Sequence, residues 1–352
     1  MDPSNLPRHL DPLEQNILEQ RGVFDLPDNS LCDALVENFF NWVAPIVPIV
    51  DRLNFLRHYQ DRESPPSLLL LHAMFTVASR YCPRENQDAG VAAPCEFYRK
   101  AKALYDAGYE QDPIPLIQST LLLGLYWEGP EGNWVLLADV TENGLFYWSR
   151  LSIALAQAQG MHLSERISSY RPPTQRLLRR IWWALYTRDR AVAAAFGRPT
   201  HIDLADCTVE PLTLNDFGRE EGCADGFHGG ADDHASFFIE YVNLWRVLEK
   251  TPSQVGSSVS TREGQIQHTT QQLHDWYMSC PSGIHWRPFY HKFLPSLLCS
   301  SYYSAICSIL LPNFSQLSED FQISCLNAAT MIVSVLETLH SCGQLQYAPT
   351  FV

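Results

Sequence analysis

Apolar residues recur every three or four positions along most of the chain, a spacing typical of helices that bury one face. Proline, glycine and short polar residues interrupt this pattern and mark the helix ends. No sustained run alternates with a period of two, and no hairpin turn joins two apolar runs. We therefore predict an all-α fold, an irregular multi-helix bundle or array without significant sheet. The predicted helices are 31–43, 52–59, 67–81, 96–110, 115–128, 144–159, 174–195, 236–250, 263–279, 288–311 and 320–340.

The ends of this pattern indicate how the chain is organised. Residues 1–28 are polar and rich in proline, so we predict a flexible lead-in there. Residues 29–352 read as one helical domain, interrupted by loops near 133–144 and 215–235. Gly160 follows the helix over 144–159 and suits its C′ position.

The segment 176–192 predicts which side of its helix is buried. Its apolar stripe consists of Leu178, Ile181, Trp182, Leu185 and Val192. The residues expected largely on the other side are Arg176, Arg179, Arg180, Trp183, Thr187 and Arg190. We predict that Thr174 caps this helix and that Gly197 and Pro199 end it.

Asp189 lies four residues after Leu185 and so shares the buried stripe. A carboxylate is costly to bury unless it is paired, so we predict an arginine partner. Arg198, in the following turn, is the nearest candidate by sequence. We interpret Asp189 as a structural carboxylate that closes a helix–loop junction, in preference to a catalytic acid.

Composition narrows the possible functions. The 352 residues are 46% hydrophobic, which is ample for a folded core, and the net charge is −14. DNA affinity depends largely on basic residues that displace counterions, so this acidic chain is a poor autonomous DNA binder. The apolar run from Leu294 to Leu311 reaches the lower length limit for a membrane span, but its serines and prolines favour a buried core helix. We expect no membrane association.

The ten cysteines include no CxxC pair, which zinc modules need in order to present two thiolates from one turn. The first twenty residues do not resemble a signal peptide. We therefore interpret the cysteines as reduced and mostly buried.

The sequence gives little support for an enzyme. The segment 226–234 contains a His-Gly-Gly and the potential ligands His228, Asp232, Asp233 and His234, but no GxSxG elbow accompanies it. No P-loop, HExxH or DDxxD motif occurs, and the histidine pairs near 270 and 288 are spaced by six residues. We expect no catalytic, cofactor-binding or metal-binding residues. A helical enzyme without a recognisable motif remains the competing class.

Four segments in order resemble the fungal-specific transcription factor domain, the middle homology region of binuclear zinc-cluster regulators. They are Pro45–Tyr59, Phe97–Gly132, Phe146–Leu163 and Arg176–Phe217, and the subgroup with the cutinase transcription factors is most similar. The string RRIWW, RDR, GRP and DCxV in the last segment is highly specific. The residues that carry the resemblance are Trp127, Gly129, Trp148, Gly160, Arg179, Arg180, Trp182, Trp183, Asp189, Arg190, Gly197, Arg198, Pro199 and Asp206.

The resemblance implies a nuclear regulatory domain that tunes transcription of a metabolic or secondary-metabolite gene set. It also implies protein partners, either a second copy or another zinc-cluster regulator, and a small apolar effector in the helical core. Zinc and DNA contacts belong to the family's six-cysteine module, which matches no residue here. Relative to the family, residues 133–144 look like an insertion and the C-terminus looks truncated. The alternative is a modulator that does not bind DNA and pairs with full-length regulators.

Overall fold

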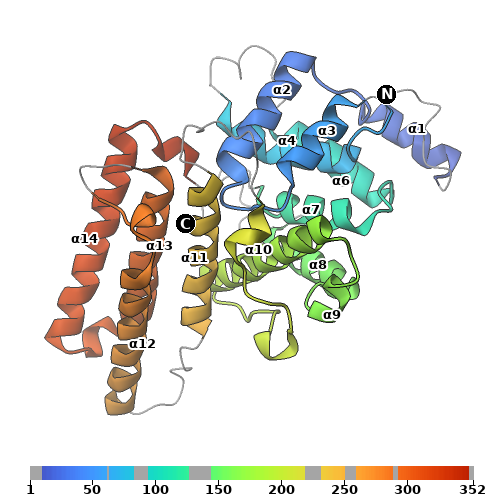
Figure 1. The fold of residues 1–352 in the computed structure, drawn as a ribbon. Coiled ribbons are helices and arrows are strands. Elements are labelled where there is room, and N and C mark those ends of the chain that lie inside the picture. Colours follow the sequence, from blue (N-terminus) through green and yellow to red (C-terminus); the bar gives the residue numbers. More distant parts are fainter. Residues whose placement is uncertain are drawn as a thin grey trace. The chain divides into compact units, whose positions relative to one another are not determined.

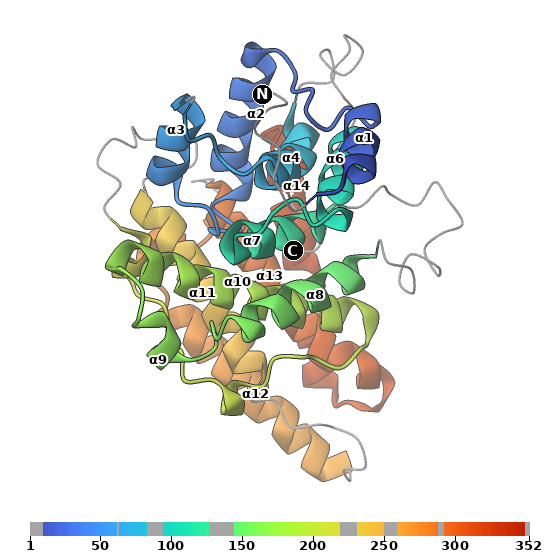
Figure 2. The ribbon, with the colours of Figure 1, turned by 90° about the vertical axis from the view of Figure 1, so that its right-hand side faces the viewer.

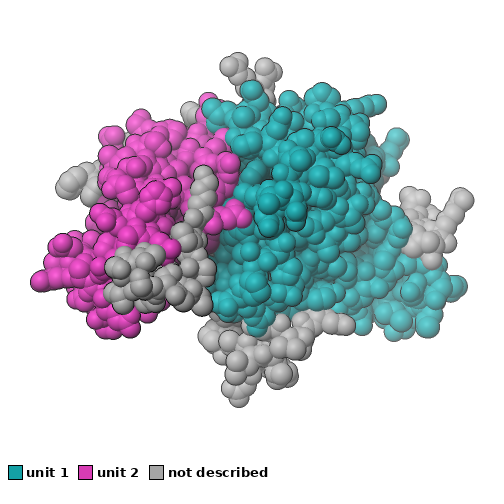
Figure 3. Space-filling model, turned by 90° about the horizontal axis from the view of Figure 1, so that it is seen from below, with its two compact units in different colours: residues 1–218 teal, residues 219–352 magenta. Residues whose placement is uncertain are grey.

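The computed structural model describes residues 10–61, 63–82, 94–126, 144–218, 231–249, 259–287 and 292–348. The chain divides into two compact units, residues 1–218 and residues 219–352, which are coloured separately in Figure 3. The regular elements over these described ranges are helices, and none is a strand. The prediction of an all-α fold is confirmed.

Unit 1 is built around α4 (Leu68–Ala78), in which every side chain is buried. The neighbours that pack against α4 are α2 (Asn29–Asn38), α6 (Pro94–Asp106) and α7 (Pro113–Leu123), as Figures 1 and 2 show. A central helix buried all round is expected for a segment that is apolar on every face. The other helices of the unit are α1 (Pro12–Gln20), α3 (Arg52–Gln60), α8 (Leu145–Ala158), α9 (Ser164–Ile167) and α10 (Pro172–Phe196).

The predicted lead-in over 1–28 contains a packed helix, which corrects the sequence interpretation. Asp11 and Glu14 form a capping box at the start of α1, each side chain accepting a backbone N–H of the other residue. Leu10, Leu18 and Val23 are buried. Polar residues outnumber these three apolar residues in the segment 1–28, and for that reason the sequence pattern there resembles that of a loop.

A buried hydrogen bond ties this segment to the central helix. His72 in α4 lies 2.7 Å, through its Nε2 atom, from the carbonyl oxygen of Val23. The carbonyl is an acceptor, so Nε2 carries the proton and donates it. Burial lowers the pKa of His72 to about 4, which keeps the ring neutral.

Helix α10 is buried on more sides than the apolar period predicted. The stripe from Leu178 to Val192 is buried as expected, but Arg180, Trp183, Thr187 and Arg190 are buried too. The helix begins at Pro172 with Arg171 as its N-cap residue, so the predicted cap at Thr174 is wrong. Pro172 occupies the first helical position, where its missing N–H leaves no hydrogen bond unmade. Gly197 ends the helix in the left-handed conformation with φ of 61°, as predicted.

The described part of unit 2 contains four α-helices: α11 (Ala231–Glu249), α12 (Val259–Ser279), α13 (Phe293–Leu310) and α14 (Glu319–Ser341). Helix α13 packs against the other three. By length and composition α13 and α14 could each cross a membrane, but 78% of α13 is buried inside the protein. The prediction of a core helix over 294–311 is therefore confirmed. Only 22% of the corresponding window of α14 is buried.

The pKa of His72 predicts a pH dependence of unit 1. The pKa of His72 is lower in the folded chain than its unfolded value of about 6.5. Between these two values His72 binds a proton in the unfolded chain but not in the folded chain. The free energy of unfolding is therefore unaffected by His72 above about pH 6.5, and it decreases as the pH falls toward about 4. Between about pH 7 and about pH 5 we expect His72 to account for a loss of roughly 2 kcal/mol in the free energy of unfolding.

Chemical denaturation at both pH values measures this loss. His72→Gln keeps an amide donor for the Val23 carbonyl but does not titrate, so its loss should be smaller than that of the parent by this amount. The exposed His274 supplies the control, since His274→Gln should behave like the parent. Equal pH dependence in the parent and in His72→Gln would contradict the assignment.

Candidate functional site: the signature helix and the adjacent pocket

Asp189 joins the end of α10 to the segment that follows it. Its Oδ2 atom accepts the backbone N–H groups of His201 at 2.8 Å and of Ile202 at 2.9 Å. Arg190 Nη1 lies 3.3 Å from the same oxygen, and Arg190 Nη2 donates to the Ile202 carbonyl at 2.7 Å. The prediction that an arginine meets Asp189 is confirmed by Arg190. The buried carboxylate closes the helix–loop junction by satisfying two backbone donors and one charge.

Arg198, the candidate chosen from the sequence, lies over aromatic rings. Its guanidinium carbon is 4.5 Å from the centre of the Phe146 ring and 6.0 Å from that of Phe196. The Arg150 guanidinium also lies over Phe146, at 3.7 Å. These cation–π contacts connect α8 to the end of α10.

A second set of contacts holds residues 208–217 against α10. Arg179 forms ion pairs with Asp216 at 3.0 Å and with Glu210 at 3.4 Å. Trp183 Nε1 donates to the Glu210 carbonyl at 2.9 Å. The buried Asp216 carboxylate also accepts the backbone N–H and the hydroxyl of Thr213. The conspicuous arginines and tryptophans of this helix therefore act as scaffold.

Two other residues of the resemblance, Trp148 and Gly160, are fixed by the packing of the fold. Trp148 is 1% exposed and its Nε1 donates to the Tyr98 hydroxyl at 2.9 Å. Gly160 has φ of 73°, and a Cβ atom there would come within 2.7 Å of Arg166 Cγ, so only glycine fits without a shift. Pro199 and Asp206 are exposed, while Trp127 and Gly129 lie outside the residues that the structure describes.

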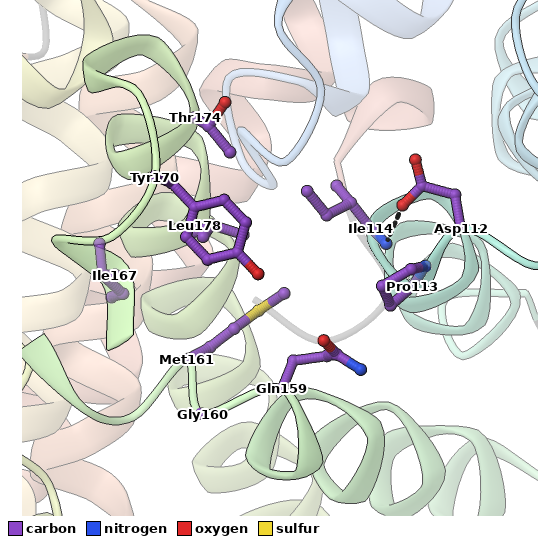
Figure 4. A pocket seen from close by; sticks show the side chains of 10 residues that line it. All are labelled: Asp112, Pro113, Ile114, Gln159, Gly160, Met161, Ile167, Tyr170, Thr174 and Leu178. Atoms are coloured by element: carbon purple, nitrogen blue, oxygen red, sulfur yellow. Dashed lines mark hydrogen bonds between the residues drawn. The ribbon is translucent and has the colours of Figure 1, made fainter. Parts of the chain in front are cut away.

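A pocket lies beside α10 in unit 1, and Gly160 is one of the residues that line it (Figure 4). Its volume is about 320 Å³, and it lies between the start of α7, the turn from α8 to α9 and the first turns of α10. Met161 and Tyr170 point into it in Figure 4. The ten residues that line the pocket are Asp112, Pro113, Ile114, Gln159, Gly160, Met161, Ile167, Tyr170, Thr174 and Leu178.

The lining of this pocket combines an apolar floor with a polar edge. Met161, Ile167 and Leu178 are buried, whereas Asp112 and Gln159 are exposed to solvent. Asp112 Oδ1 accepts the backbone N–H of Ile114 at 2.9 Å, which caps α7 and fixes the carboxylate at the edge. Such a lining suits a small apolar molecule that carries a hydrogen-bond donor at one end.

The sequence analysis did not identify this pocket. Its residues come from three segments whose apolar members look like ordinary core positions. The one local signal is the Asp112–Pro113 start of α7, which marks a helix cap but not a cavity.

The candidate metal ligands near residue 230 do not assemble into a site over the part that the structure describes. Asp232, Asp233 and His234 lie in the first turn of α11, and Asp233 forms an ion pair with Lys292 at 3.0 Å. His228 lies outside the described residues. Within the described ranges no group of three histidine, cysteine or acidic side chains is positioned to hold a metal.

The described cysteines are all free thiols. Burial raises the pKa of the Cys32 and Cys299 thiols to about 11, so both remain protonated and weakly reactive at neutral pH. This agrees with the interpretation of the cysteines as reduced, mostly buried residues.

Comparison with known proteins defines the class. The model of the fungal-specific transcription factor domain matches residues 36–323, and the chain belongs to this family. No solved structure matches the chain significantly.

Curated relatives place the chain among fungal transcription regulators. Cutinase transcription factor 1 alpha of Fusarium vanettenii is 41% identical over 97% of this chain and 39% of the relative. An acetamidase regulatory protein of Aspergillus fumigatus is 31% identical over 92% of this chain and 41% of the relative. A fusaric acid cluster transcription factor of Gibberella fujikuroi is 28% identical over 53% of this chain and 27% of the relative. The chain thus spans about two fifths of the length of the first two.

The contacts of Asp189 generate a prediction about stability. Asp189→Asn removes the charge opposite Arg190 and replaces one acceptor oxygen with a donor, so buried backbone N–H groups lose partners. We expect a loss of about 3 kcal/mol in the free energy of unfolding of unit 1. Asp206→Asn, an exposed position of the same motif, should change it by less than about 0.5 kcal/mol. Chemical denaturation of both variants at neutral pH tests this, and equal stabilities would refute the junction role.

Proposed function

We propose that this chain is the regulatory region of a nuclear transcription regulator that controls a metabolic or secondary-metabolite gene set. The match of the family domain to residues 36–323 carries this proposal. The relatives named above support the kind of target, since their names connect them with cutinase, acetamidase and a fusaric acid gene cluster.

The chemistry of the described residues is consistent with a regulatory role. Charged side chains of α10 and of the turn that follows it contact backbone groups, acids and aromatic rings of the fold. A domain of this kind acts through contacts with other proteins and through ligands that change those contacts. DNA contact in such regulators belongs to a zinc-cluster module, because this acidic chain is poorly suited to bind phosphates.

Gene deletion in the fungus that carries the chain tests the regulatory role. We expect coordinated changes in the transcripts of one metabolic gene set, and restoration when the gene is returned in tagged form. Microscopy should find the tagged protein in the nucleus, and chromatin immunoprecipitation should recover the promoters of the same genes. An unchanged transcriptome together with a cytoplasmic protein would refute the proposal.

The pocket beside α10 is the proposed effector site. Its apolar floor and the edge formed by Asp112 and Gln159 favour an apolar body with one donor group. The floor includes Leu178 of α10, and Met161 lies next to His162, whose carbonyl accepts the backbone N–H groups of Thr208 and Val209. A ligand seated there would touch the same scaffold that holds the segment 208–217.

Benzyl alcohol, which has an apolar ring and a hydroxyl donor, is a suitable probe of this pocket. Saturation-transfer NMR should detect its binding to the full chain. Ile114→Trp, at the partly exposed rim, should fill the pocket and weaken the binding at least about ten-fold, or roughly 1.4 kcal/mol. Leu13→Trp, at an exposed position of α1, is the control for an added indole ring. Equal binding to both variants would place the probe elsewhere.

A further inference from the structure

A second pocket lies in unit 2, beside the C-terminal half of α14. Its volume is about 550 Å³, and it shares no residue with the pocket in unit 1. Most of its lining comes from α14, the helix that packs along α13 in Figure 1. We call it the α14 pocket, and the six residues that line it are Trp286, Met331, Ser334, Glu337, Thr338 and Ser341.

The three hydroxyl groups of the α14 pocket already use their protons. Ser334 Oγ donates to the Thr330 carbonyl at 3.1 Å. Thr338 Oγ1 donates to the Ser334 carbonyl at 2.8 Å, and Ser341 Oγ donates to the Thr338 carbonyl at 2.9 Å. A hydroxyl has one proton and two lone pairs, so each of these oxygens can only accept a further hydrogen bond. The backbone N–H groups along this part of α14 are used by the helix itself.

Glu337 adds a carboxylate to these acceptors. Its side chain is exposed where it lines the pocket, and over the described ranges it forms no ion pair. A carboxylate accepts hydrogen bonds and donates none. The one side-chain donor among the lining residues, Trp286 Nε1, is inaccessible to solvent and so does not face the open space. The lining therefore offers acceptors and negative charge to a ligand.

Trp286 and Met331 form the apolar wall of the pocket. A backbone hydrogen bond joins Trp286 to Tyr277 of α12. The Tyr277 ring in turn stacks on Tyr302 of α13, with ring centroids 4.4 Å apart. The packing of α12 on α13 thus fixes the tryptophan beside α14. Indole is the side-chain ring that attracts cations most strongly, and the methionine thioether adapts to varied apolar shapes.

We propose that the α14 pocket binds a protonated organic amine with an apolar body. The ammonium group lies near Glu337 and donates to the hydroxyl oxygens of Ser334 and Thr338, while the body packs on Trp286 and Met331. Carboxylate-bearing ligands are disfavoured, because Glu337 repels them and no lining side chain donates to them. This site goes beyond the regulatory function proposed above and does not depend on the effector pocket, which belongs to the other unit.

The probe is 2-phenylethylamine, which is protonated at neutral pH. Saturation-transfer NMR titration of the full chain should detect its binding, and the neutral analogue 2-phenylethanol should bind at least about five-fold more weakly. Glu337→Gln should weaken binding of the amine at least about five-fold, or roughly 1 kcal/mol, and that of the alcohol much less. Glu319→Gln is the matched control, because it removes the same charge from an exposed position of α14 outside the pocket and should bind like the parent.

A trimethylated probe separates the charge from the hydrogen bonds. (2-Phenylethyl)trimethylammonium keeps the ring and the charge but has no N–H donor. Thr338→Val removes one acceptor with little change in shape, so it should weaken binding of the primary amine at least about three-fold and leave the trimethylated probe unaffected. Trp286→Leu should weaken binding of both, because both cations lose the indole ring. Far-UV circular dichroism checks that the variants remain folded.

Three results would overturn the proposal. The first is a parent chain that does not bind 2-phenylethylamine. The second is equal binding of this amine to Glu337→Gln and Glu319→Gln. The third is loss of amine binding in Ile114→Trp, which fills the pocket of unit 1. That result would move the amine to unit 1 and leave the effector proposal standing, so the two proposals fail separately.

Discussion

In the described part of unit 1, the buried carboxylate of Asp189 accepts backbone hydrogen bonds that no helix or strand accepts. Helix α10 ends at Gly197, and the chain then continues in extended turns whose backbone N–H groups have no helical acceptor. Asp189 supplies that acceptor from inside the helix, and Arg190 balances its charge while donating to the Ile202 carbonyl. Trp183 and Arg179 repeat the same principle about two and about three turns earlier by holding Glu210 and Asp216. A segment without regular structure is thereby fixed on a rigid helix.

This arrangement gives a structural role to residues that are also typical of active sites. Buried arginines, acids and tryptophan N–H groups are expensive to desolvate, so most of them need a partner in the folded protein. For Arg179, Trp183, Asp189 and Arg190 the partners are backbone groups and side chains of opposite charge. The pocket beside this scaffold has an apolar floor and a polar edge, which suits a small apolar ligand.

Unit 2 is organised on a different principle. Its centre is the apolar helix α13, and α14 covers one side of it while keeping a second apolar stripe exposed. The buried residues of α14 and its exposed aliphatic residues both recur at spacings of three and four positions.

The sequence by itself determined the helical class, the position of most helices and the structural interpretation of Asp189, because the apolar period and the burial cost of a carboxylate are local properties. Tertiary structure decided the rest. It selected backbone amides and Arg190 as partners of Asp189, and amides are present at every residue and leave no trace in the sequence. It also turned Leu10, Leu18 and Val23 of a polar segment into buried anchors, and buried Arg180 and Arg190 on faces that seemed polar. The pocket joins three distant segments, and the open face of α14 depends on which neighbours are present, so neither can be read from a single helix.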